Sequence, residues 1–344
     1  MSAILQELLR VSEKAAHIAR ACRQQDALFQ LLIEEKKGGE KNKKFAVDFK
    51  TLADVLVQEV IKRHMESKFP GLEDKIFGEE SNEFTNALGE MIVLRLCPTE
   101  GETAELLSKV LNGNQLAAGA LAKVVHEDVA FADPALDSVQ VTIPHDTLGI
   151  WVDPIDSTHQ YIQGSADVEP SHGVFPRGLP CVTILIGVYD LRTGLPLMGV
   201  INQPFVSQDP DTLRWEGRCY WGLSYMGTNI HSLLPRGTFR FCIQGLVDLY
   251  VFSYDTTFKW DSCAPHAILR AMGGGMVDFQ GCLARGPAAG REWPQLLYHV
   301  GHEGARGVDR WANKGGLIAY RSRQQLETFL SLLAPHLVPA DARA

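Results

Sequence analysis

The sequence lacks the features that define several common protein classes. No stretch of about 20 apolar residues occurs among its 344 residues, which argues against a membrane-spanning helix. The N-terminus has no basic segment followed by an apolar run, so we see no secretory signal. The seven cysteines are scattered and contain no Cys-x-x-Cys pair, which is typical of reduced thiols. We therefore expect a cytoplasmic protein without a membrane partner.

An excess of positive charge is also missing. The chain has 33 Lys and Arg residues against 41 Asp and Glu residues, for a net charge of −8 and a pI near 5.8. Such a chain is a poor candidate for binding nucleic acid or an anionic membrane, and we expect neither. An anionic substrate would then need metal ions or a few well-placed basic groups.

The sequence signatures of several enzyme classes are absent. There is no GxxxxGK[ST] phosphate loop, no GxSxG nucleophile motif and no HExxH zinc motif. Gly273-Gly274-Gly275 follows a predicted helix, so it indicates the end of that helix and not a dinucleotide-binding loop. The lysine-rich segment 36–44 is open to two interpretations, a solvated loop or a phosphate-attracting flap, and we favour the loop.

The predicted secondary structure indicates an α/β (α+β) fold. Apolar periodicity predicts helices over 2–34 (one helix, or two broken near 23–25), 51–68, 99–130, 260–271 and 324–333. It predicts strands over 76–78, 148–152, 181–189, 196–201, 219–221, 246–252 and 317–320, whereas 229–241 shows no clear period. The length suggests two domains, which we place at 1–155, an α+β metal-site domain, and 156–344, an α/β domain.

Acidic side chains stand at the ends of four predicted elements. Asp153-Pro154-Ile155-Asp156 places two acids around a proline directly after an apolar strand, where both carboxylates can face one point. Glu79-Glu80 ends another apolar segment, and Asp54 and Asp261 begin helices. Because Mg²⁺ prefers carboxylate oxygens, these clusters predict a site for two or three ions.

Each cluster also has an ordinary structural interpretation. Asp54 and Asp261 could serve only as helix caps, and Glu79-Glu80 could lie in a solvated loop. A capping role explains the Asp153–Asp156 string less well. If a helix starts at Ser157-Thr158, the hydroxyl and backbone N–H groups there would form a phosphate cradle, and Thr158 would be placed to orient a water toward phosphorus.

Four motifs, in this order, resemble the Mg²⁺-dependent, lithium-inhibited phosphatases. They are Asp48-x-x-Thr51-x-x-Asp54, Gly78-Glu79-Glu80-Ser81, Asp153-Pro154-Ile155-Asp156-Ser157-Thr158 and Trp260-Asp261-x-x-Ala264. That superfamily includes inositol monophosphatase, fructose-1,6-bisphosphatase and bisphosphate nucleotidase. The resemblance covers nearly the whole chain. Ser157, where smaller relatives usually carry glycine, and the roughly 70 residues between Glu80 and Asp153 resemble the branch that acts on inositol polyphosphates.

The resemblance implies a layered α-β-α-β-α sandwich and removal of the 1-phosphate from inositol 1,4-bisphosphate and inositol 1,3,4-trisphosphate. It further implies two or three Mg²⁺ ions, inhibition by Li⁺, a small-molecule partner and a monomer. Glu79, Asp153 and the backbone carbonyl of Ile155 resemble the ligands of the first metal ion. Asp153, Asp156 and Asp261 resemble those of the second, and Asp156 would also contact the substrate.

The remaining roles follow from the same resemblance. Asp54 and Glu79 would hold a third ion, and Glu80 belongs to the same acidic shell, as a further metal and catalytic residue. Thr158, with Asp54, would activate the attacking water, and Ser157 would help to hold the phosphate. Metal ions would neutralise the developing charge, so that no covalent nucleophile is needed.

One region departs from the family pattern. Only about 17 residues, Thr228–Gln244, stand where the family carries a strand, a helix, another strand and the start of a second helix that grip the inositol ring and its distal phosphates. About 50 residues are absent by this comparison, so we expect an incomplete second domain, truncated around 228–244. Two alternatives stay open: a 3′(2′),5′-bisphosphate nucleotidase, and a catalytically impaired isoform that lacks part of the substrate pocket.

Overall fold

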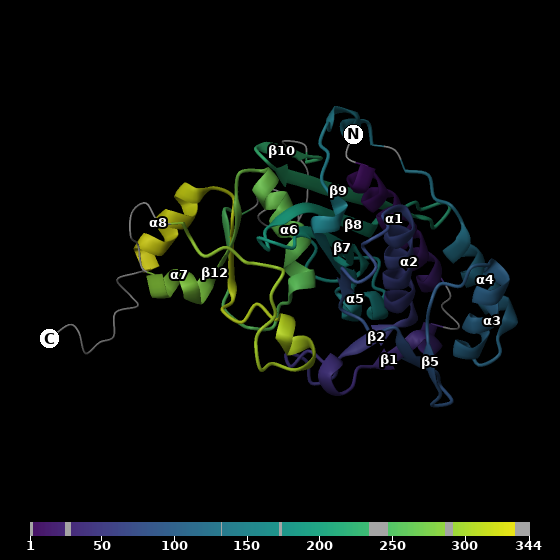
Figure 1. Ribbon diagram of the computed structural model, residues 1–344. Coiled ribbons are helices and arrows are strands. Elements are labelled where there is room, and N and C mark those ends of the chain that lie inside the picture. The colour runs from purple at the N-terminus through teal and green to yellow at the C-terminus, as the bar shows by residue number, and fades with distance from the viewer. Residues whose placement is uncertain are drawn as a thin grey trace.

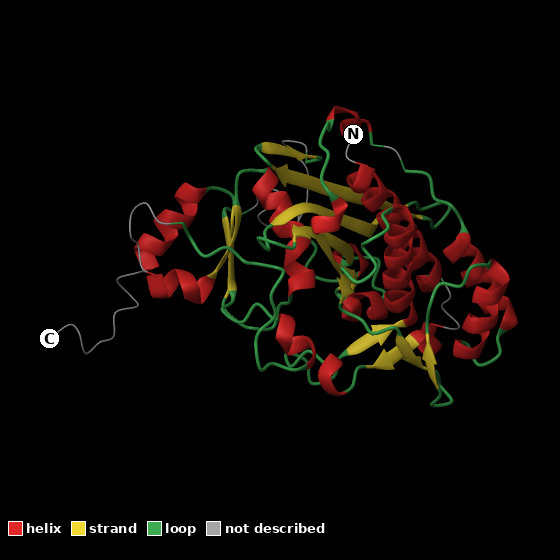
Figure 2. Cartoon of the chain, in the orientation of Figure 1, coloured by secondary structure: helices red, strands yellow, loops and turns green. Residues whose placement is uncertain are grey.

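The structure, a computed structural model, describes residues 3–24, 29–131, 133–171, 174–233, 247–285 and 292–333. Its elements stack as helices, a sheet, a helix, a second sheet and outer helices (Figures 1 and 2). This confirms the predicted layered α/β fold. The proposed domain boundary at residue 155 falls inside the strand Leu148–Asp156 of the first sheet, and the division into domains stays a prediction.

The first sheet has six strands in the order β10-β9-β8-β7-β6-β3. The strands are β3 (Ile76–Gly78), β6 (Leu148–Asp156), β7 (Thr183–Asp190), β8 (Pro196–Gln208), β9 (Trp215–Tyr225) and β10 (Thr228–His231). β3 runs parallel to β6, whereas the other neighbours are antiparallel. The predicted strands are confirmed, with β6, β8 and β9 longer than predicted, and the absence of a pattern over 229–241 hid β10, a short edge strand.

Helices α1 (Ala3–Arg23) and α2 (Leu52–Lys68) cover one face of this sheet, and α3 (Glu100–Val110) and α4 (Gln115–His126) lie beyond them (Figure 1). The helix predicted over 99–130 is two helices, because Asn112 and Gly113 adopt left-handed conformations (φ 52° and 86°) that end α3. Within the described residues, no helix is both long and apolar enough to cross a membrane.

The helix predicted over 2–34 is correct only as far as Arg23. The region that follows contains β1 (Ile33–Glu35), which pairs with β2 (Phe49–Thr51), and a second small hairpin consists of β4 (Glu83–Thr85) and β5 (Met91–Val93). Short 3₁₀ helices connect the larger elements: η1 (Phe29–Leu32), η2 (Gly38–Glu40), η3 (Pro134–Ser138), η4 (His145–Thr147), η5 (Leu179–Cys181) and η6 (Gly307–Trp311).

Helix α6 (Lys259–Ala271) lies directly on the other face of the first sheet. Gly187, Gly199 and Gly222 are neighbours in register on β7, β8 and β9 beneath it. A Cβ at Gly222 would lie 2.8 Å from Ile268 Cα, and one at Gly199 would collide with the carbonyl oxygen of Ala264. This glycine row therefore lets the helix backbone approach the sheet backbone, which fixes the position of α6.

The second sheet has three antiparallel strands in the order β11-β13-β12. They are β11 (Leu249–Phe252), β12 (Gly275–Asp278) and β13 (Leu317–Tyr320), with α7 (Phe279–Arg285) and α8 (Arg323–Leu333) on the outer side (Figure 1). Along β13, Leu317 and Ala319 pack with the α6 cluster, whereas Ile318 and Tyr320 pack with Leu326 of α8. The sequence reading missed β12, which follows the glycine run after α6 with only four residues.

Candidate active site

The acidic residues after β3 and within β6 meet because these two strands are parallel. Gly78 pairs with Val152, and the Glu79 backbone N–H donates to the Val152 carbonyl oxygen at 3.1 Å. The carboxyl ends of neighbouring parallel strands lie at one edge of a sheet. Glu79 and Asp153, which are far apart in the sequence, therefore lie side by side through the pairing of β3 with β6.

Two further acids come from helix N-termini. Thr51 caps α2, and Asp54 Oδ2 accepts hydrogen bonds from Thr51 N at 2.7 Å and Thr51 Oγ1 at 2.6 Å. At the start of α6, Asp261 Oδ2 accepts from Phe258 N at 2.6 Å. The capping interpretation of both residues is thus confirmed. It does not compete with a functional one, since both carboxyl groups are buried beside the other acids.

The end of β6 is irregular between Asp153 and Asp156, after which Asp156 pairs with Thr183 of β7. Thr183 Oγ1 donates to Asp156 Oδ2 at 3.0 Å. Ser157 then adopts a left-handed conformation (φ 69°, ψ 44°), and α5 (Thr158–Gln163) begins. The predicted helix start is confirmed. Thr158 Oγ1 donates its proton to the carbonyl oxygen of Ile155 at 3.0 Å.

A cavity of about 890 Å³ opens at this edge of the sheet. It brings together seven of the nine predicted site residues: Glu79, Asp153, Ile155, Asp156, Ser157, Thr158 and Asp261. Asp54 and Glu80 do not line it but lie behind it, with 1% and 6% of their surface exposed. The remaining wall is largely apolar, from β7, β8, α6 and the second sheet, and includes Leu185, Ile201, Leu269, Met276, Leu317 and Ala319.

Burial and mutual repulsion perturb the acids strongly. Burial, followed by the charges of Glu79, Asp156 and Asp261, raises the pKa of Asp153 well above its usual range. Burial raises the pKa of Asp54 to about 7 and that of Asp261 to about 8. Like charges held together in a low dielectric favour the protonated forms. A nearby cation would reverse this preference and allow the carboxylates to ionise together.

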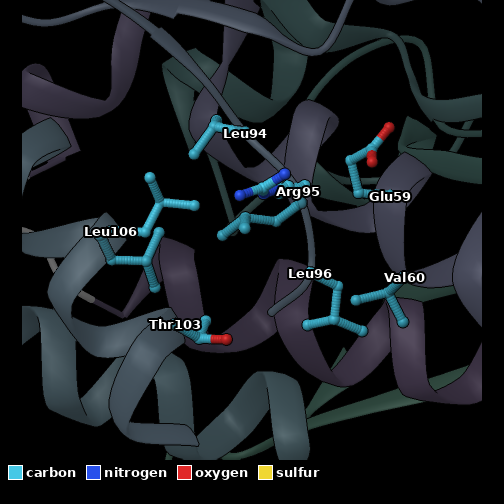
Figure 3. Close-up of a pocket in the computed structure, with 9 residues that line it drawn as sticks. Glu59, Val60, Leu94, Arg95, Leu96, Thr103 and Leu106 are labelled. Atoms are coloured by element: carbon cyan, nitrogen blue, oxygen red, sulfur yellow. The ribbon is translucent and has the colours of Figure 1, made fainter. Parts of the chain in front are cut away.

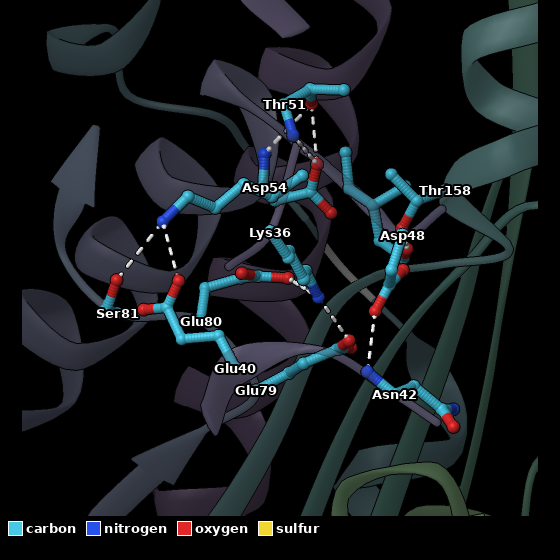
Figure 4. Close-up of polar contacts among 12 residues, drawn as sticks. Lys36, Glu40, Asn42, Asp48, Thr51, Asp54, Glu79, Glu80, Ser81 and Thr158 are labelled. Atoms are coloured by element: carbon cyan, nitrogen blue, oxygen red, sulfur yellow. Dashed lines mark hydrogen bonds and ion pairs between the residues drawn. The ribbon is translucent and has the colours of Figure 1, made fainter. Parts of the chain in front are cut away.

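The chain itself supplies one cation, Lys36, whose charge opposes but does not overcome the burial that raises the pKa of Asp54 and Glu80. Lys36 is buried, and its Nζ lies 2.6 Å from Glu79 Oε1 and 2.5 Å from Glu80 Oε1 (Figure 4). With the side chains in these positions, no three His, Cys, Asp or Glu residues in the described ranges are arranged to hold a metal ion. The Lys36 ammonium group thus lies between the carboxylates of Glu79 and Glu80.

The predicted solvated loop over residues 36–44 is confirmed for residues 37–39 and 43–44, which are exposed, but not for Lys36, which is buried. Lys36 lies in the acidic cluster (Figure 4). Lys50, beyond this segment, is also buried, with its Nζ 3.4 Å from Glu40 Oε2. Farther along the loop, Lys43 Nζ lies 2.5 Å from Asp255 Oδ2, so the loop is tied to the C-terminal half. The sequence did contain a signal for this role of Lys36: five lysines stand shortly before the first acidic motif in a chain that is acidic overall.

A second cavity lies between α2, α3 and the segment Leu94–Leu96, with Glu59 and Arg95 among its mainly apolar lining (Figure 3). Its volume is about 10 Å³, which is at most the space that one water molecule needs. It cannot hold a substrate, so the large acidic cavity is the candidate active site among the described residues.

The comparisons with known proteins agree with this site. The model of the inositol monophosphatase family matches residues 4–240 and residues 236–326. The chain belongs to the inositol monophosphatase family. It is 66% identical to inositol polyphosphate 1-phosphatase of Bos taurus and 65% identical to that of Homo sapiens, covering 98% and 99% of this chain and 99% of each relative. It is 27% identical to 3′(2′),5′-bisphosphate nucleotidase 1 of Rattus norvegicus, over 80% of this chain and 84% of the relative.

The same alignments bear on the predicted internal deletion. The alignment to the Bos taurus relative spans 395 positions, and this chain has 344 residues, so at least 51 positions have no residue here. The two stretches that match the family model meet at residues 236–240. That point lies inside the predicted interval 228–244. Residues 234–246 themselves lie outside the described residues.

Proposed function

We propose that this family member is a Mg²⁺-dependent phosphatase that removes the 1-phosphate of inositol polyphosphates, with inositol 1,4-bisphosphate and inositol 1,3,4-trisphosphate as substrates. The observation that carries the proposal is the convergence of Glu79, Asp153, Asp156 and Asp261 on one cavity beside Thr158. The identities of 66% and 65% to two inositol polyphosphate 1-phosphatases support the substrate class, whereas 27% to the nucleotidase gives weaker support to the nucleotide alternative.

The side chains present fit magnesium. The donors are carboxylate and carbonyl oxygens, which hard divalent cations prefer. Glu80 Oε2 and Asp153 Oδ1 are buried and have no hydrogen-bond partner among the described residues, as expected of groups that await a cation. In this proposal Glu79, Asp153 and the Ile155 carbonyl hold the first ion.

The other acids complete the metal shell. Asp153, Asp156 and Asp261 would hold the second ion, Asp54 and Glu79 the third, and Glu80 would support Glu79 from behind. When bound, Mg²⁺ lowers the pKa of a coordinated water and neutralises charge on the phosphate. Inhibition by Li⁺ is part of the proposal and rests on the motif resemblance.

The chain's own groups would orient the water and the phosphate. Thr158 Oγ1 donates its hydrogen bond to the Ile155 carbonyl oxygen. Its lone pairs therefore remain free to accept a hydrogen bond from a water molecule in the cavity. That contact would direct an oxygen lone pair of the water toward phosphorus. Asp54 would assist through the same water, and the Ser157 hydroxyl and Asp156 would position the phosphate group.

Phosphate release from inositol 1,4-bisphosphate, with and without Mg²⁺ and Li⁺, tests this proposal. Asp153→Ala should lower kcat at least about 100-fold, since a metal ligand contributes more than the residues that merely orient one. Exposed Asp211, in the β8–β9 turn, supplies the control D211N, which should keep wild-type activity. Full turnover by D153A would sink the proposal, and faster release from 3′-phosphoadenosine 5′-phosphate would favour the nucleotidase alternative.

A catalytically impaired chain is the competing proposal, because at least 51 positions of the relatives are missing here. A thermal melt followed by circular dichroism, run on the protein used for the assay, separates the two cases. Cooperative unfolding together with Mg²⁺-dependent turnover supports the enzyme. Cooperative unfolding without turnover supports the impaired chain.

A further inference from the structure

Lys44 is the basic residue of the lysine-rich loop that faces the large cavity. It lines the cavity together with Asn42, Phe45 and Asp48 of the same loop. Its Nζ lies 5.5 Å from the ring centroid of Phe45 and 5.8 Å from that of Phe252 on β11. Cation–π contacts of this length hold an ammonium group without neutralising it. Lys44 is thus placed between the loop and the second sheet.

Apart from Lys37, which is exposed and does not line the cavity, the other lysines on or next to this loop have polar partners. Lys36 pairs with Glu79 and Glu80, and Lys41 donates to the Ala46 carbonyl oxygen. Lys43 lies 2.5 Å from Asp255 Oδ2 and 3.7 Å from Asp309 Oδ1, and Lys50 pairs with Glu34 and Glu40. Within the described ranges, Lys44 has ring contacts but no ion pair with a carboxylate.

The charges around the cavity are strongly one-sided. Among the described residues that line it, five are carboxylates and Lys44 is the only lysine or arginine. Mg²⁺ ions would offset the carboxylates at the cleaved phosphate. A second phosphate on the substrate, away from the metal ions, would still need its own cation, because burying an unpaired dianion is strongly unfavourable.

The loop is anchored on both sides of Lys44, which limits the positions that its exposed side chain can reach. Lys43 is tied to Asp255, and the Asn42 side chain donates to the Thr256 carbonyl oxygen at 3.3 Å. On the other side, Asp48 Oδ2 accepts from Asn42 N at 2.9 Å. Preorganised groups lose less entropy when they bind a ligand.

We propose that Lys44 is a specificity-determining residue that binds the second, uncleaved phosphate of a bisphosphorylated substrate. This rests on the proposed function for the identity of the cleaved phosphate. The ammonium would form a charge-assisted hydrogen bond with that phosphate, an interaction that a singly phosphorylated inositol cannot make. Lys44 therefore contributes to the preference between the two classes of substrate and not to bond cleavage.

Calorimetric titration tests this with inositol 1,4-bisphosphate and inositol 1-phosphate, using Ca²⁺ in place of Mg²⁺ to occupy the oxygen ligands. The wild-type protein should bind the bisphosphate at least about tenfold more tightly. K44Q should lose about tenfold for the bisphosphate and less than about twofold for the monophosphate, and K44R should restore most of the difference. Lys37, which is exposed and does not line the cavity, supplies the control K37Q.

Steady-state kinetics gives a second measurement. K44Q should raise KM for the bisphosphate and leave kcat within about twofold, because the interaction is made equally in the ground state and the transition state. A wild-type protein without preference for the bisphosphate, or a K44Q protein that keeps the preference, would overturn the assignment. Absence of turnover with the binding preference intact would instead overturn the proposed function and leave the role of Lys44 standing.

Discussion

The two sheets differ in how they are built and in what they contribute. The first sheet has six strands and is covered on both faces. Its strand β6 carries Asp153 and Asp156, and Glu79 directly follows its strand β3. The second has three strands of four residues, and its edge strand β11 leaves Tyr250 and Val251 about 40% exposed. The second sheet forms part of the cavity wall but carries none of the predicted site residues. The first sheet and the adjoining helices thus hold all the predicted site residues, whereas the second sheet contributes only cavity wall.

The missing positions border the weaker layer. The family matches meet at residues 236–240, which lie in the sequence between β10 of the first sheet and β11 of the second. Asp261 lies on α6, whose position is fixed by the glycine row of the first sheet. The acids proposed to bind metal ions therefore stay together although these positions are missing.

The largest expected effect is a loss of stability when a core side chain is truncated beside either sheet. Leu8 of α1 and Leu326 of α8 are both fully buried, one in the first core cluster and one under the second sheet. L8A and L326A should each cost about 2–5 kcal/mol of local or global stability. Hydrogen exchange should show L8A accelerating exchange throughout, and L326A mainly in β11–β13 and α8.

Exposed Leu332→Ala serves as the control and should change stability by less than about 0.5 kcal/mol. If L326A accelerated exchange in β7 and β8 as much as in β13, the two sheets would form one cooperative unit and the comparison would break.

The pH dependence of stability probes the layer between the sheets. His266 of α6 is fully buried, 3.0 Å from Tyr298 OH, and burial lowers its pKa to about 3. Below the ordinary pKa of about 6.5 the unfolded chain binds a proton that the folded protein does not, so this stability is present above pH 6.5 and is lost as pH falls. At pH 5 the contribution of His266 to the free energy of unfolding should be about 2 kcal/mol lower than at pH 8.

Urea unfolding at pH 5, 6, 7 and 8 measures this effect, and H266Q isolates it. The variant should start from a lower stability at pH 7 and then show a shallower fall toward pH 5 than the wild type. If the unfolding free energy of the two proteins depended equally on pH, His266 would have an ordinary pKa in the folded protein, and water would reach it in spite of its burial.

The glycine row gives a test with a smaller effect on stability and a separate effect on activity. In G199A the new methyl group meets the backbone of α6 at Ala264, so helix and sheet must separate. We expect a cost of about 1–3 kcal/mol and a fall in kcat, because the N-terminal turn of α6 carries Asp261. Gly119 of α4 has nothing within 4 Å, and G119A should be neutral or stabilising. Unchanged kcat in G199A would show that Asp261 does not depend on this contact.

The smallest effect is expected at Ser157, whose φ of 69° strains a residue other than glycine. S157G should relieve this strain and raise stability by about 0.5–1 kcal/mol. If the hydroxyl holds the phosphate, the same variant should raise KM. A thermal melt and a KM measurement separate the two effects, and a rise in stability with unchanged KM would remove Ser157 from the proposed phosphate contacts.

The long periodic segments and the acidic motifs could be read from the sequence. Helix α6, β7 and β8 were predicted because their apolar patterns are long, and Asp153 was recognised because it follows a buried strand. β10 and β12 were missed because neither has a continuous apolar run: β10 is Thr-Asn-Ile-His, and β12 begins with a glycine and ends with an aspartate. The position of Lys36 could not be read, since ion pairing depends on tertiary contacts that a loop composition does not specify. The metal ions, monomeric state and cytoplasmic location stay predictions.

The buried ion pair of Lys36 has a consequence for the kinetics of metal uptake. In the proposed function Glu79 is a metal ligand, yet its carboxylate already pairs with the Lys36 ammonium at 2.6 Å, and that lysine belongs to the loop that Lys43 connects to Asp255. If that proposal holds, metal uptake would have two phases. Uptake at the other cavity-lining acids would be proportional to the Mg²⁺ concentration, whereas uptake at Glu79 would reach a plateau rate set by release of the lysine.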